Sequence, residues 1–463
     1  MKRNFKNSII LSTTIAFALT SIYSCNSNQK NDGNWESLFN GKDLTGWKTA
    51  GGDAKYLIED DAIVGVMTKG TPNSFLITEK NYGDFILELD VKLEGNSTNS
   101  GVQTRSHFDS TANEGRGKVY GRQVEIDPTD RAWTGGIYDE GRREWLYPLD
   151  LNPEAKSAYK AEEFNHIRIE AIGNETKTWV NGIPTSYVVD SIDNSGFIGL
   201  QVHSIPDSLD GKKVYFKNIK IDTTALQPKA LPGDLYIVNT VANNLTKQEQ
   251  DAGYSLLFNG KDHTGWHSAR GGEFPEKGWQ IENGIISVQK SGGGESTNGG
   301  DIVTDKLYKA FDLSFDFKLT PGANSGIKYY VTLDEKTEGS AIGPEYQILD
   351  DELHPDAKLG KNGNRTLSSL YDLITSDRNP RPRKPIGSWN RGRIVSSPDN
   401  KVTYYLNGFK MLEFVRGSKE FRDLVAGSKY KDWENFGESP QGHILIQDHG
   451  DEVSFRSIKI KEL

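Results

Sequence analysis

One ten-residue stretch, LFNGKDLTGW at residues 38–47, returns at residues 257–266 with a single change, Leu44 against His263. A match of this length does not arise by chance, and a repeat period of this size indicates two whole domains rather than short solenoid units. The stretch predicts a strand, an Asn-Gly turn and a second strand. It holds no combination of side chains with an obvious chemical use, so we interpret it as a structural marker of where each domain begins.

The two halves also share landmarks further along the chain. Phe85–Leu93 matches Phe311–Leu319, and an Asn-Ser-Gly triplet follows each run. Short apolar or alternating runs broken by Gly, Asn and Asp are typical of antiparallel strands, and the 48 glycines fit the many turns. We therefore predict an all-β protein of two antiparallel sandwiches in tandem. The predicted domains are 35–223 and 253–463, joined by a linker at 224–252.

Composition narrows the function classes. The chain has 463 residues, too many for a single hydrophobic core. Its net charge is −9, and its acidic and basic residues are mixed along the chain without a long basic run. Nucleic acid is therefore not expected as a partner. The single cysteine, Cys25, excludes an internal disulfide framework and a cysteine-rich metal site.

The N-terminal segment has the pattern of a bacterial lipoprotein signal. Lys2, Arg3 and Lys6 precede an apolar run at 9–19, and a small residue stands directly before Cys25. This run is too short to span a membrane. We expect a signal peptide at 1–24, lipidation of Cys25 and a tether at 25–34, which would anchor the protein in the cell envelope, periplasmic or outer-membrane facing. The alternative is an ordinary secretory signal with an unrelated cysteine.

A polar cluster in the second half is the first candidate for chemistry. Glu345 and Gln347 fall on one face of a predicted strand, and Asp350 and His354 lie in the loop that follows. Carboxylates and imidazole close together suit a divalent ion held by Glu345, Asp350 and His354, or a general base. A polar strand followed by an acidic turn would explain the same pattern without chemistry.

A second cluster lies near the C-terminus. His443 and Gln447 share one strand face, and His449 continues it beside an aspartate. His443, His449 and Glu345 are therefore candidates for catalysis, with Lys384 as a candidate for stabilising an oxyanion. Further candidates for substrate contacts in this half are Gln347, Arg365, Tyr371, Trp389 and Gln447.

The first half keeps the polar pair in reversed order, as Gln123 and Glu125. Arginines interleaved with aromatic rings follow, an arrangement typical of carbohydrate sites because rings stack on sugars and arginine donates paired hydrogen bonds. A solvated loop or a domain interface would have the same composition. Phe197 occupies the position of His443, which favours the second half as the catalytic one. The first-half candidates for substrate contacts are Gln123, Glu125, Arg131, Trp133, Tyr138 and Arg142.

Together these landmarks resemble the 3-keto-disaccharide hydrolase domain family. The resemblance rests on the LFNGKD-x-TGW opening, the strand with its Asn-Ser-Gly, residues 345–350, residues 405–408 and the closing strand at 453–460, and it covers nearly all of residues 35–463. It implies two concanavalin A-like jelly-roll sandwiches in tandem, of the kind that has its site on the concave sheet. It also implies cleavage of glycosides whose C3 hydroxyl a partner oxidoreductase has first converted to a ketone.

The implied chemistry needs a base and an oxyanion stabiliser. A 3-keto group acidifies the proton on C2, so a modest base can remove it, and the oxygen on C1 can then leave by β-elimination. A divalent metal, lysine or arginine would stabilise the enolate. Glu345, Gln347 and Asp350 match the polar strand of the family. The competing hypotheses are a lectin-like, non-catalytic glycan-binding lipoprotein and an interaction protein of the cell envelope.

Overall fold

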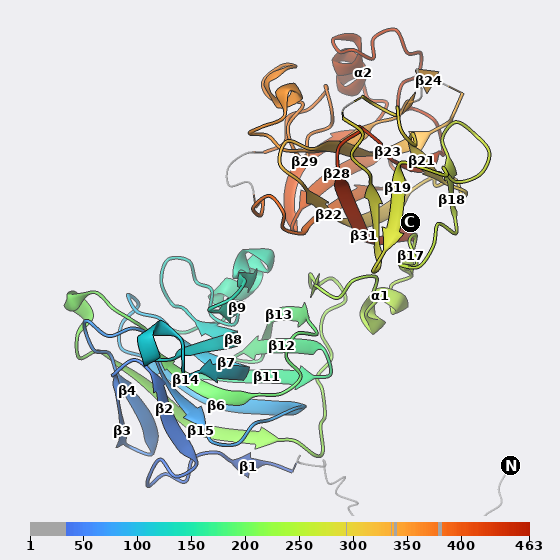
Figure 1. Ribbon diagram of the computed structural model, residues 1–463. Coiled ribbons are helices and arrows are strands. Elements are labelled where there is room, and N and C mark those ends of the chain that lie inside the picture. Colours follow the sequence, from blue (N-terminus) through green and yellow to red (C-terminus); the bar gives the residue numbers. More distant parts are fainter. Residues whose placement is uncertain (1–33, 293, 335, 338–339, 378–381) are drawn as a thin grey trace, which may run out of the picture.

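The computed structural model describes residues 34–463, with gaps at 293, 335, 338–339 and 378–381 (Figure 1). Cys25 and the predicted signal peptide lie outside these residues. Two β-rich units follow one another along the chain, the first coloured blue to green and the second yellow to red. The fold is all-β, as predicted, with a pair of β-sheets forming the sandwich in each unit.

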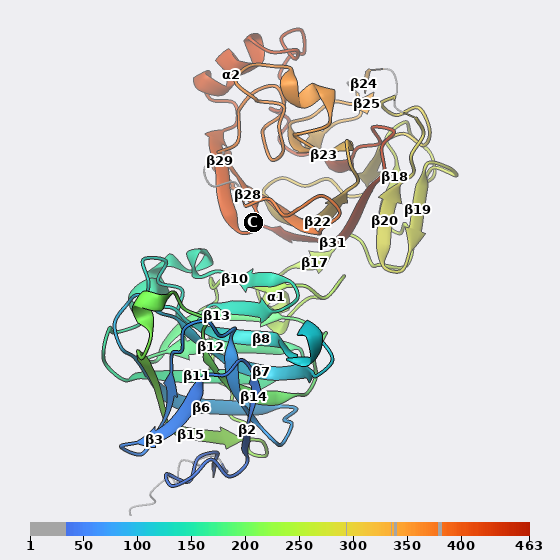
Figure 2. The same ribbon diagram turned by 60° about the vertical axis from the view of Figure 1, so that its left-hand side comes forward.

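The first sandwich consists of a nine-stranded and a seven-stranded sheet. Figure 2 shows the two layers, with β6, β11 and β15 in one and β7, β8 and β14 in the other. The larger sheet has the order β16-β13-β12-β11-β6-β15-β4-β3, with β1 beside β15. Its strands are β1 (Glu36–Ser37), β3 (Lys55–Glu59), β4 (Ala62–Val66), β6 (Phe85–Leu93), β11 (Asn165–Ile172), β12 (Glu175–Val180), β13 (Ile183–Val189), β15 (Lys213–Asp222) and β16 (Val238–Asn239).

The smaller sheet of the first sandwich has the order β10-β9-β8-β7-β14-β5-β2. It curls enough that β2 approaches β8 across its outer face. Alternation along its strands sends Leu76, Val102, Val124 and Leu200 into the core between the sheets. Its strands are β2 (Trp47–Gly51), β5 (Ser74–Thr78), β7 (Ser100–Asp109), β8 (Lys118–Ile126), β9 (Ile137–Glu140), β10 (Glu144–Tyr147) and β14 (Phe197–Val202).

The second sandwich repeats this plan. Its larger sheet has the order β19-β20-β31-β22-β27-β28-β29 with β17 beside β31, and its smaller sheet the order β18-β21-β30-β23-β26. The larger sheet contains β17 (Ser255–Leu256), β19 (Trp279–Glu282), β20 (Ile285–Val288), β22 (Phe311–Leu319), β27 (Asn390–Ser396), β28 (Lys401–Leu406), β29 (Phe409–Val415) and β31 (Val453–Glu462). The smaller contains β18 (Trp266–Ser268), β21 (Ile302–Thr304), β23 (Asn324–Val331), β26 (Glu345–Leu349) and β30 (His443–Ile446), and β24 (Lys336–Thr337) pairs with β25 (Ser340–Ala341) outside it.

The described residues contain two α-helices. α1 (Lys247–Asp251) begins at a capping box in which the Thr246 hydroxyl accepts from the Glu249 N–H and the Glu249 carboxylate accepts from the Thr246 N–H. α2 (Lys419–Ala426) is capped by Ser418, whose side chain accepts from the Phe421 N–H. Single 3₁₀ turns are η1 (Asn113–Gly115), η2 (Leu149–Leu151), η3 (Pro153–Ser157), η4 (Asp207–Leu209) and η5 (Pro355–Lys358). No helix in the described part of the chain has the length and apolar character needed to cross a bilayer.

The repeated stretch has the same structural role in both sandwiches. The Trp47 indole donates to the Leu38 carbonyl at 2.7 Å, and the Trp266 indole donates to the Leu257 carbonyl at 2.7 Å. This hydrogen bond fixes the position of each indole at the edge of its core, and both Trp47 and Trp266 are buried. The stretch is a structural marker, as the sequence indicated.

The linker joins the two units through specific contacts. β16, within the linker, adds a parallel strand to β13 of the first sandwich. The Arg391 guanidinium of the second sandwich donates to the Asn239 carbonyl at 2.7 Å. Asn243 exchanges hydrogen bonds with Ser457 of the closing strand. The linker is therefore partly extended and packed against both units.

Candidate functional site

The candidate site lies on the outer face of the smaller sheet of the second sandwich. Lys328 on β23 stands opposite Glu345 on β26, and Gly326 stands opposite Gln347. The alternate residues Ile327 and Tyr346 point into the core. Strand alternation thus places Lys328, Glu345 and Gln347 on the same outward face.

Gly326 leaves the room that the Glu345 side chain occupies. A Cβ at position 326 would lie 2.2 Å from the Glu345 Oε1 atom, so any larger residue would displace the carboxyl group. Glu345 is only 4% exposed. Burial raises the pKa of Glu345 to about 7, although nearby Lys328 and Lys429 lower it. A carboxyl group with this pKa can both take and return a proton near neutral pH.

Lys328 is a buried cation among carboxylates. Its Nζ lies 3.6 Å from a Glu295 oxygen and 3.8 Å from an Asp301 oxygen. Burial opposes the charge, but Asp301, Glu345 and Glu295 together raise the pKa of Lys328. Burial also raises the pKa of Asp301 to about 6, an effect that Lys328 partly offsets. Lys328 therefore stays protonated and offers a fixed positive charge beside Glu345.

A second lysine approaches from the loops over this face. The Lys429 Nζ lies 4.3 Å from the centre of the Tyr371 ring and 5.1 Å from that of Tyr430. Burial lowers the pKa of Lys429, and Glu345 partly restores it. A pocket of about 220 Å³ opens here, lined by Glu295, Lys328, Ile342, Gly343, Lys429, Tyr430 and Trp433. The pocket joins aromatic rings to two lysines, a combination that suits a sugar ring carrying an acidic carbon.

Two buried side chains of this face, Gln447 beside the pocket and Asn324 next to Asp451, carry polar atoms without a partner among the described residues. The Gln447 amide nitrogen donates to Glu295 at 2.9 Å, but its Oε1 accepts no hydrogen bond from the described residues. The Oδ1 of buried Asn324 is likewise unpaired within that part of the chain. Unpaired buried acceptors are costly in a folded protein, so a ligand hydroxyl is a natural partner for both.

A potential metal-binding group lies at the other end of the same face. His354, His449 and Asp451 each offer a ligand atom within 4.8 Å of the others, and they are the only such group of three found among the described residues. The rings of His354 and His449 meet edge to face, with their centres 5.7 Å apart. His354 Nδ1 accepts the Asp356 N–H at 3.2 Å. Binding through this ring would require release of that hydrogen bond.

The predicted metal set of Glu345, Asp350 and His354 is not brought together. The Asp350 carboxylate accepts the N–H groups of Gly322, Glu352 and Leu353 and so holds the loop after β26. Burial raises and these backbone donors lower the pKa of Asp350, with a net lowering. Asp350 is a loop-fixing residue, and His449 and Asp451 join His354 instead.

Two of the predicted catalytic residues lie away from Glu345. His443 begins β30, opposite Val331, where its Nδ1 faces the Thr304 carbonyl at 2.5 Å and its ring packs on His267. Lys384 lies in a cleft of about 250 Å³ between the two sandwiches. Trp389 lines the same cleft and carries the Arg456 guanidinium 4.2 Å from its ring centre. Lys384 and Trp389 are thus interface residues.

Arg365 and Tyr371 shape the pocket wall. Arg365 pairs with Asp356 at 2.8 Å and with Asp372 at 2.7 Å, and it lies over the Tyr371 ring. The Tyr371 hydroxyl donates to Asp356 at 2.7 Å. Because both nitrogen edges of Arg365 are engaged, it positions Tyr371 under Lys429 rather than presenting a free charge.

In the first sandwich the polar pair is again on the outer face. Gln123 stands opposite Gln103 and donates to Glu125 at 2.9 Å. The Trp145 ring meets the Trp133 ring edge to face and the Tyr138 ring at a tilt, and Arg131 lies over Trp133. These residues form the predicted aromatic and arginine-rich patch.

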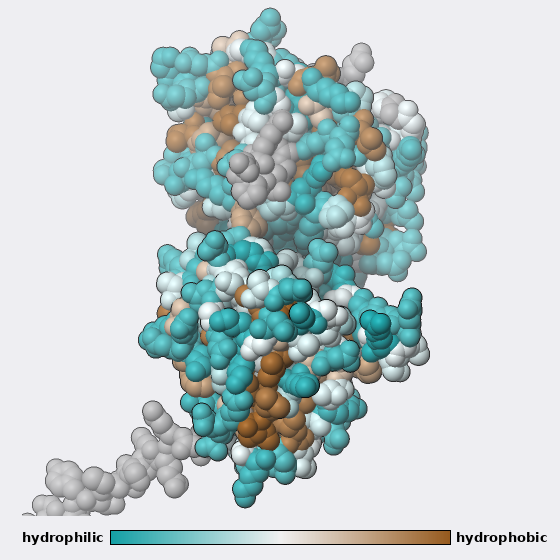
Figure 3. All heavy atoms as spheres, turned by 90° about the vertical axis from the view of Figure 1, so that its left-hand side faces the viewer, coloured by the Kyte–Doolittle hydropathy of each residue, from teal (hydrophilic) through white to brown (hydrophobic). Residues whose placement is uncertain are grey.

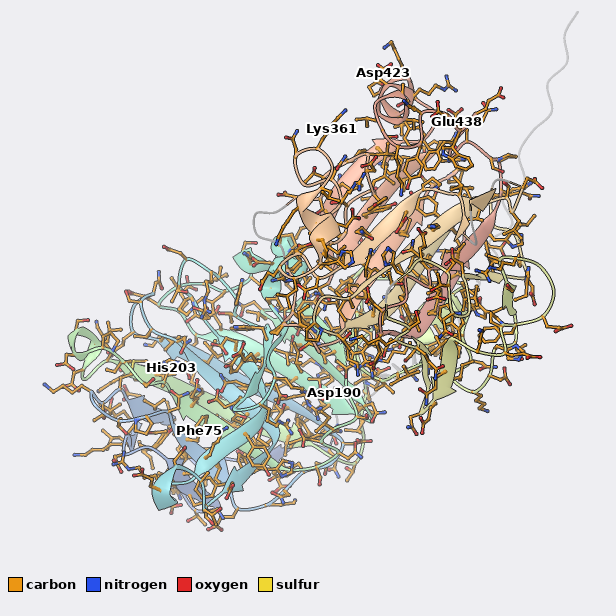
Figure 4. All side chains as sticks on the ribbon, turned by 45° about the horizontal axis from the view of Figure 1, so that its top comes forward. Phe75, Asp190, His203, Lys361, Asp423 and Glu438 are labelled. Atoms are coloured by element: carbon orange, nitrogen blue, oxygen red, sulfur yellow. The ribbon has the colours of Figure 1, made fainter. Side chains whose placement is uncertain are left out.

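Arg142 differs from the prediction. It pairs with Asp139 at 2.7 Å and Asp193 at 2.5 Å, inside a buried network that includes Arg143 and Asp190. In Figure 4, Asp190 lies apart from Phe75 and His203, on the side where it accepts from Thr240 of the linker. Arg142 therefore stabilises the sandwich next to the linker.

Sequence reasoning missed Lys328, Asp301 and Lys429. A signal for Lys328 was present, since it follows Asn-Ser-Gly by two positions where the first half has Gln103. Strand alternation from Gly326 would have placed it on the face of Glu345. Asp301 and Lys429 reach the site from loops whose course no periodicity reveals.

Comparison with known proteins gives one family and several relatives. The profile of the 3-keto-alpha-glucoside-1,2-lyase-like domain matches residues 34–222 and again 253–461. The 3-keto-disaccharide hydrolase of Bacteroides thetaiotaomicron is 38% identical over 232 residues, covering 46% of this chain and 79% of the relative. Two solved structures of candidate glycosyl hydrolases from Parabacteroides distasonis also match. The first is 34% identical with a TM-score of 0.42, and the match covers 48% of this chain and 100% of that structure's chain. The second is 27% identical with a TM-score of 0.35, and the match covers 45% of this chain and 99% of that structure's chain.

Proposed function

Since the chain belongs to the 3-keto-alpha-glucoside-1,2-lyase-like domain family, we propose that its second sandwich cleaves 3-keto-glycosides, including 3-keto-disaccharides. The observation that carries this proposal is the pairing of Glu345, whose pKa is about 7, with protonated Lys328 on one face of the sheet. The name of the Bacteroides thetaiotaomicron relative, a 3-keto-disaccharide hydrolase, supports the substrate class.

The first step is removal of the proton on C2. The Glu345 carboxylate takes this proton, and the electron pair of the C2–H bond moves to form an enolate with the charge on the C3 oxygen. Lys328 stabilises that charge without reorganisation, because Glu295, Asp301 and Glu345 already hold its ammonium in place. A ketone is required, since without it the C2 proton is far too weak an acid for a carboxylate.

The second step breaks the glycosidic bond. The enolate reforms the C3 carbonyl, a C1–C2 double bond appears, and the oxygen on C1 leaves with the bonding pair. Lys429 is the donor for the leaving oxygen, because burial lowers its pKa and makes its proton easier to give up. Addition of water to the C1–C2 double bond then completes a net hydrolysis, and without it the product is that of a lyase.

The remaining polar groups bind the sugar. Gln447 Oε1 and Asn324 Oδ1 accept hydroxyl hydrogens, and the Tyr430 and Trp433 side chains provide apolar pocket wall. Gln347 lies on the same face, opposite Gly326. No pair of carboxylates needs to flank the anomeric carbon, in contrast to ordinary glycoside hydrolysis.

A direct test uses a 3-keto-glucoside with a nitrophenol aglycone and, in parallel, the same glucoside with its C3 hydroxyl intact. We expect release of nitrophenol from the keto form alone. Equal release from both forms would replace this mechanism by ordinary hydrolysis. Binding of the keto form without any release would favour the lectin-like alternative.

We extend the proposal to a divalent cation at His354, His449 and Asp451. Two imidazoles and a carboxylate are a common donor set for zinc, manganese and related ions. Such an ion would supply a Lewis acid for a sugar oxygen at that end of the face. Titration with Zn²⁺ alone, followed by calorimetry, should show one binding event that is lost in Asp451→Asn, and an unchanged isotherm in that variant would exclude this set.

We also propose that the protein is a lipoprotein of the bacterial envelope, anchored through Cys25 and supplied with 3-keto sugars by a partner oxidoreductase. The N-terminal charge pattern and apolar run support this. A Cys25→Ser variant should leave the membrane fraction and lose its acyl chains by mass spectrometry. A variant that stays membrane-bound would contradict the anchor.

A further inference from the structure

We propose that the outer face of the first sandwich is a separate, non-catalytic binding site for an uncharged sugar. The site is made by Gln103, Gln123, Glu125 and Gln201 together with Phe75. The inference holds whether or not the second sandwich cleaves glycosides, because it concerns binding to other residues.

The residues of the two faces can be matched one to one by their hydrogen bonds and strand pairing. The Ser100 hydroxyl donates to the Gln201 carbonyl, and the Ser325 hydroxyl donates to the Gln447 carbonyl. Gln103 stands opposite Gln123 where Lys328 stands opposite Glu345. Gln201 therefore corresponds to Gln447.

The three charged groups of the catalytic face are absent from this one. Gln103 replaces Lys328 and Gln123 replaces Glu345. Leu76 pairs with Leu200 in the first sandwich as Ile302 pairs with Ile446 in the second. The residue before each of these, Phe75 and Asp301, therefore occupies the same position, and Phe75 replaces Asp301. Gln103 donates to Gln123 at 2.7 Å, so the two amides satisfy one another. The first sandwich thus has no carboxyl group at the position of Glu345 and no lysine at the position of Lys328.

The groups suited to binding are retained. Gln201 is fully buried, and neither its Oε1 nor its Nε2 has a hydrogen-bond partner in the described part of the chain. Asn99 Oδ1 and Thr98 Oγ1 are buried and unpaired in the same sense. Asn99 corresponds to Asn324, whose Oδ1 is also unpaired. The same two positions therefore keep unsatisfied polar atoms in both sandwiches, which indicates a ligand rather than chance.

Glu125 adds a further neutral group at neutral pH. Burial raises its pKa to about 8, although the hydrogen bond from Gln123 lowers it. Asn99 and Gln123 donate to its two oxygens at 3.1 and 2.9 Å. The floor of the site is thus uncharged, which suits sugar hydroxyls and disfavours acidic or basic ligands.

A buried apolar cluster lies next to these polar groups. It contains Phe75, Ile77, Val119 and Phe197, and Phe75 stands opposite Gln201. A pocket of about 640 Å³ borders the cluster at Phe75 and Val119, and its rim includes Glu140, which accepts from Asn73 at 3.3 Å. Figure 3 shows apolar side chains gathered on the first sandwich among hydrophilic ones. Apolar floor and polar rim together match the two faces of a pyranose ring.

The test measures binding of three unoxidised disaccharides, trehalose, sucrose and cellobiose, to the full chain by calorimetry. Gln201→Met has nearly the same shape and removes both unpaired polar atoms. A purely structural role would leave binding unchanged and the unfolding temperature equal or higher. We expect at least a tenfold loss of affinity for the disaccharide that binds, with the unfolding temperature retained.

Two further variants secure the result. Gln447→Met is the matched change in the second sandwich. It should leave intact the disaccharide binding that Gln201→Met removes. Glu125→Gln keeps a neutral group in place and should retain binding. Three outcomes would overturn the inference. They are an unchanged affinity in Gln201→Met, a loss of binding in Gln447→Met alone, and no binding of any of the three sugars. Failure of turnover on a 3-keto-glucoside would instead concern the proposed function only.

Discussion

The outer faces of the two sandwiches have the same geometry and opposite chemistry. Both have a glycine at the same place, Gly101 and Gly326, and a Cβ there would lie 2.3 Å from Gln123 in one and 2.2 Å from Glu345 in the other. The side chain that crosses the glycine is an amide in the first sandwich and a carboxyl in the second. The backbone of this fold thus fixes where the reactive side chain lies, while the residue type decides whether a proton can be transferred.

The charge difference is local to three positions. Lys328, Glu345 and Asp301 form a buried group in which each carboxyl has a raised pKa and the lysine remains charged. Their counterparts in the first sandwich carry no charge. A buried ionic group that replaces hydrogen-bonded amides is costly to fold, and the role that we propose for it in proton transfer gives a reason for its presence in the second sandwich.

The largest effect is expected when the second face is converted toward the first at Glu345. Glu345→Gln removes the base and should lower kcat/KM on the 3-keto-glucoside by about 10²- to 10⁴-fold. The unfolding temperature should fall modestly, because the variant removes one of the three carboxyl partners of the buried Lys328 ammonium. Aglycone release and thermal unfolding measure the two effects. A rate within a few-fold of the native protein would remove Glu345 from the mechanism.

The second conversion, Lys328→Gln, removes the enolate-stabilising cation. We expect a loss of about 10²- to 10³-fold in kcat, as for loss of an oxyanion-stabilising group. The matched change Gln103→Lys in the first sandwich should produce no second active site, because Gln123 still offers no base. Full activity of Lys328→Gln would show that another group stabilises the enolate.

The pH dependence sharpens the assignment of the base. Glu345 must be ionised to act, and its pKa is about 7. Activity should therefore rise about tenfold from about pH 6 to about pH 8, following the ionised fraction. In Lys328→Gln the rise should move to higher pH, because Lys328 lowers the pKa of Glu345. A profile that is flat over this range would point to a different base.

The smallest effect is expected for Lys384→Gln. The side chain lies in the cleft between the sandwiches, where burial and then Arg391 lower its pKa. Because it lies away from Glu345, turnover should change by less than about twofold. Initial rates on the same substrate decide this. A large loss would return Lys384 to the catalytic site that its sequence position suggested.

Much of the fold could be predicted from the sequence. The repeat at residues 38–47 and the strand alternation are local patterns, and local patterns are kept in the folded protein. The placement of Glu345 and Gln347 on one face of their strand followed from alternation alone. The rest of the site depends on loops: Lys429 and Asp301 arrive there through tertiary packing that no period in the sequence encodes.

The misplaced candidates have a common cause. Lys384, Trp389 and Arg142 were chosen for residue type and closeness in sequence to other polar residues. In the structure, Arg142 pairs with Asp139 and Asp193, and Trp389 packs against Arg456. Charged and aromatic residues that find partners of their own become structural, and the sequence does not reveal those partners when they lie far apart along the chain.

The double variant Lys328→Gln, Glu345→Gln tests the central claim most directly, because it gives the second face the pair of amides found in the first. The measurement is the rate of aglycone release from the 3-keto-glucoside, with thermal unfolding to establish that the chain is folded. We predict a folded protein whose rate is at least about 10²-fold below that of the native chain. A folded double variant with a rate within about twofold of native would contradict the assignment of cleavage to this face.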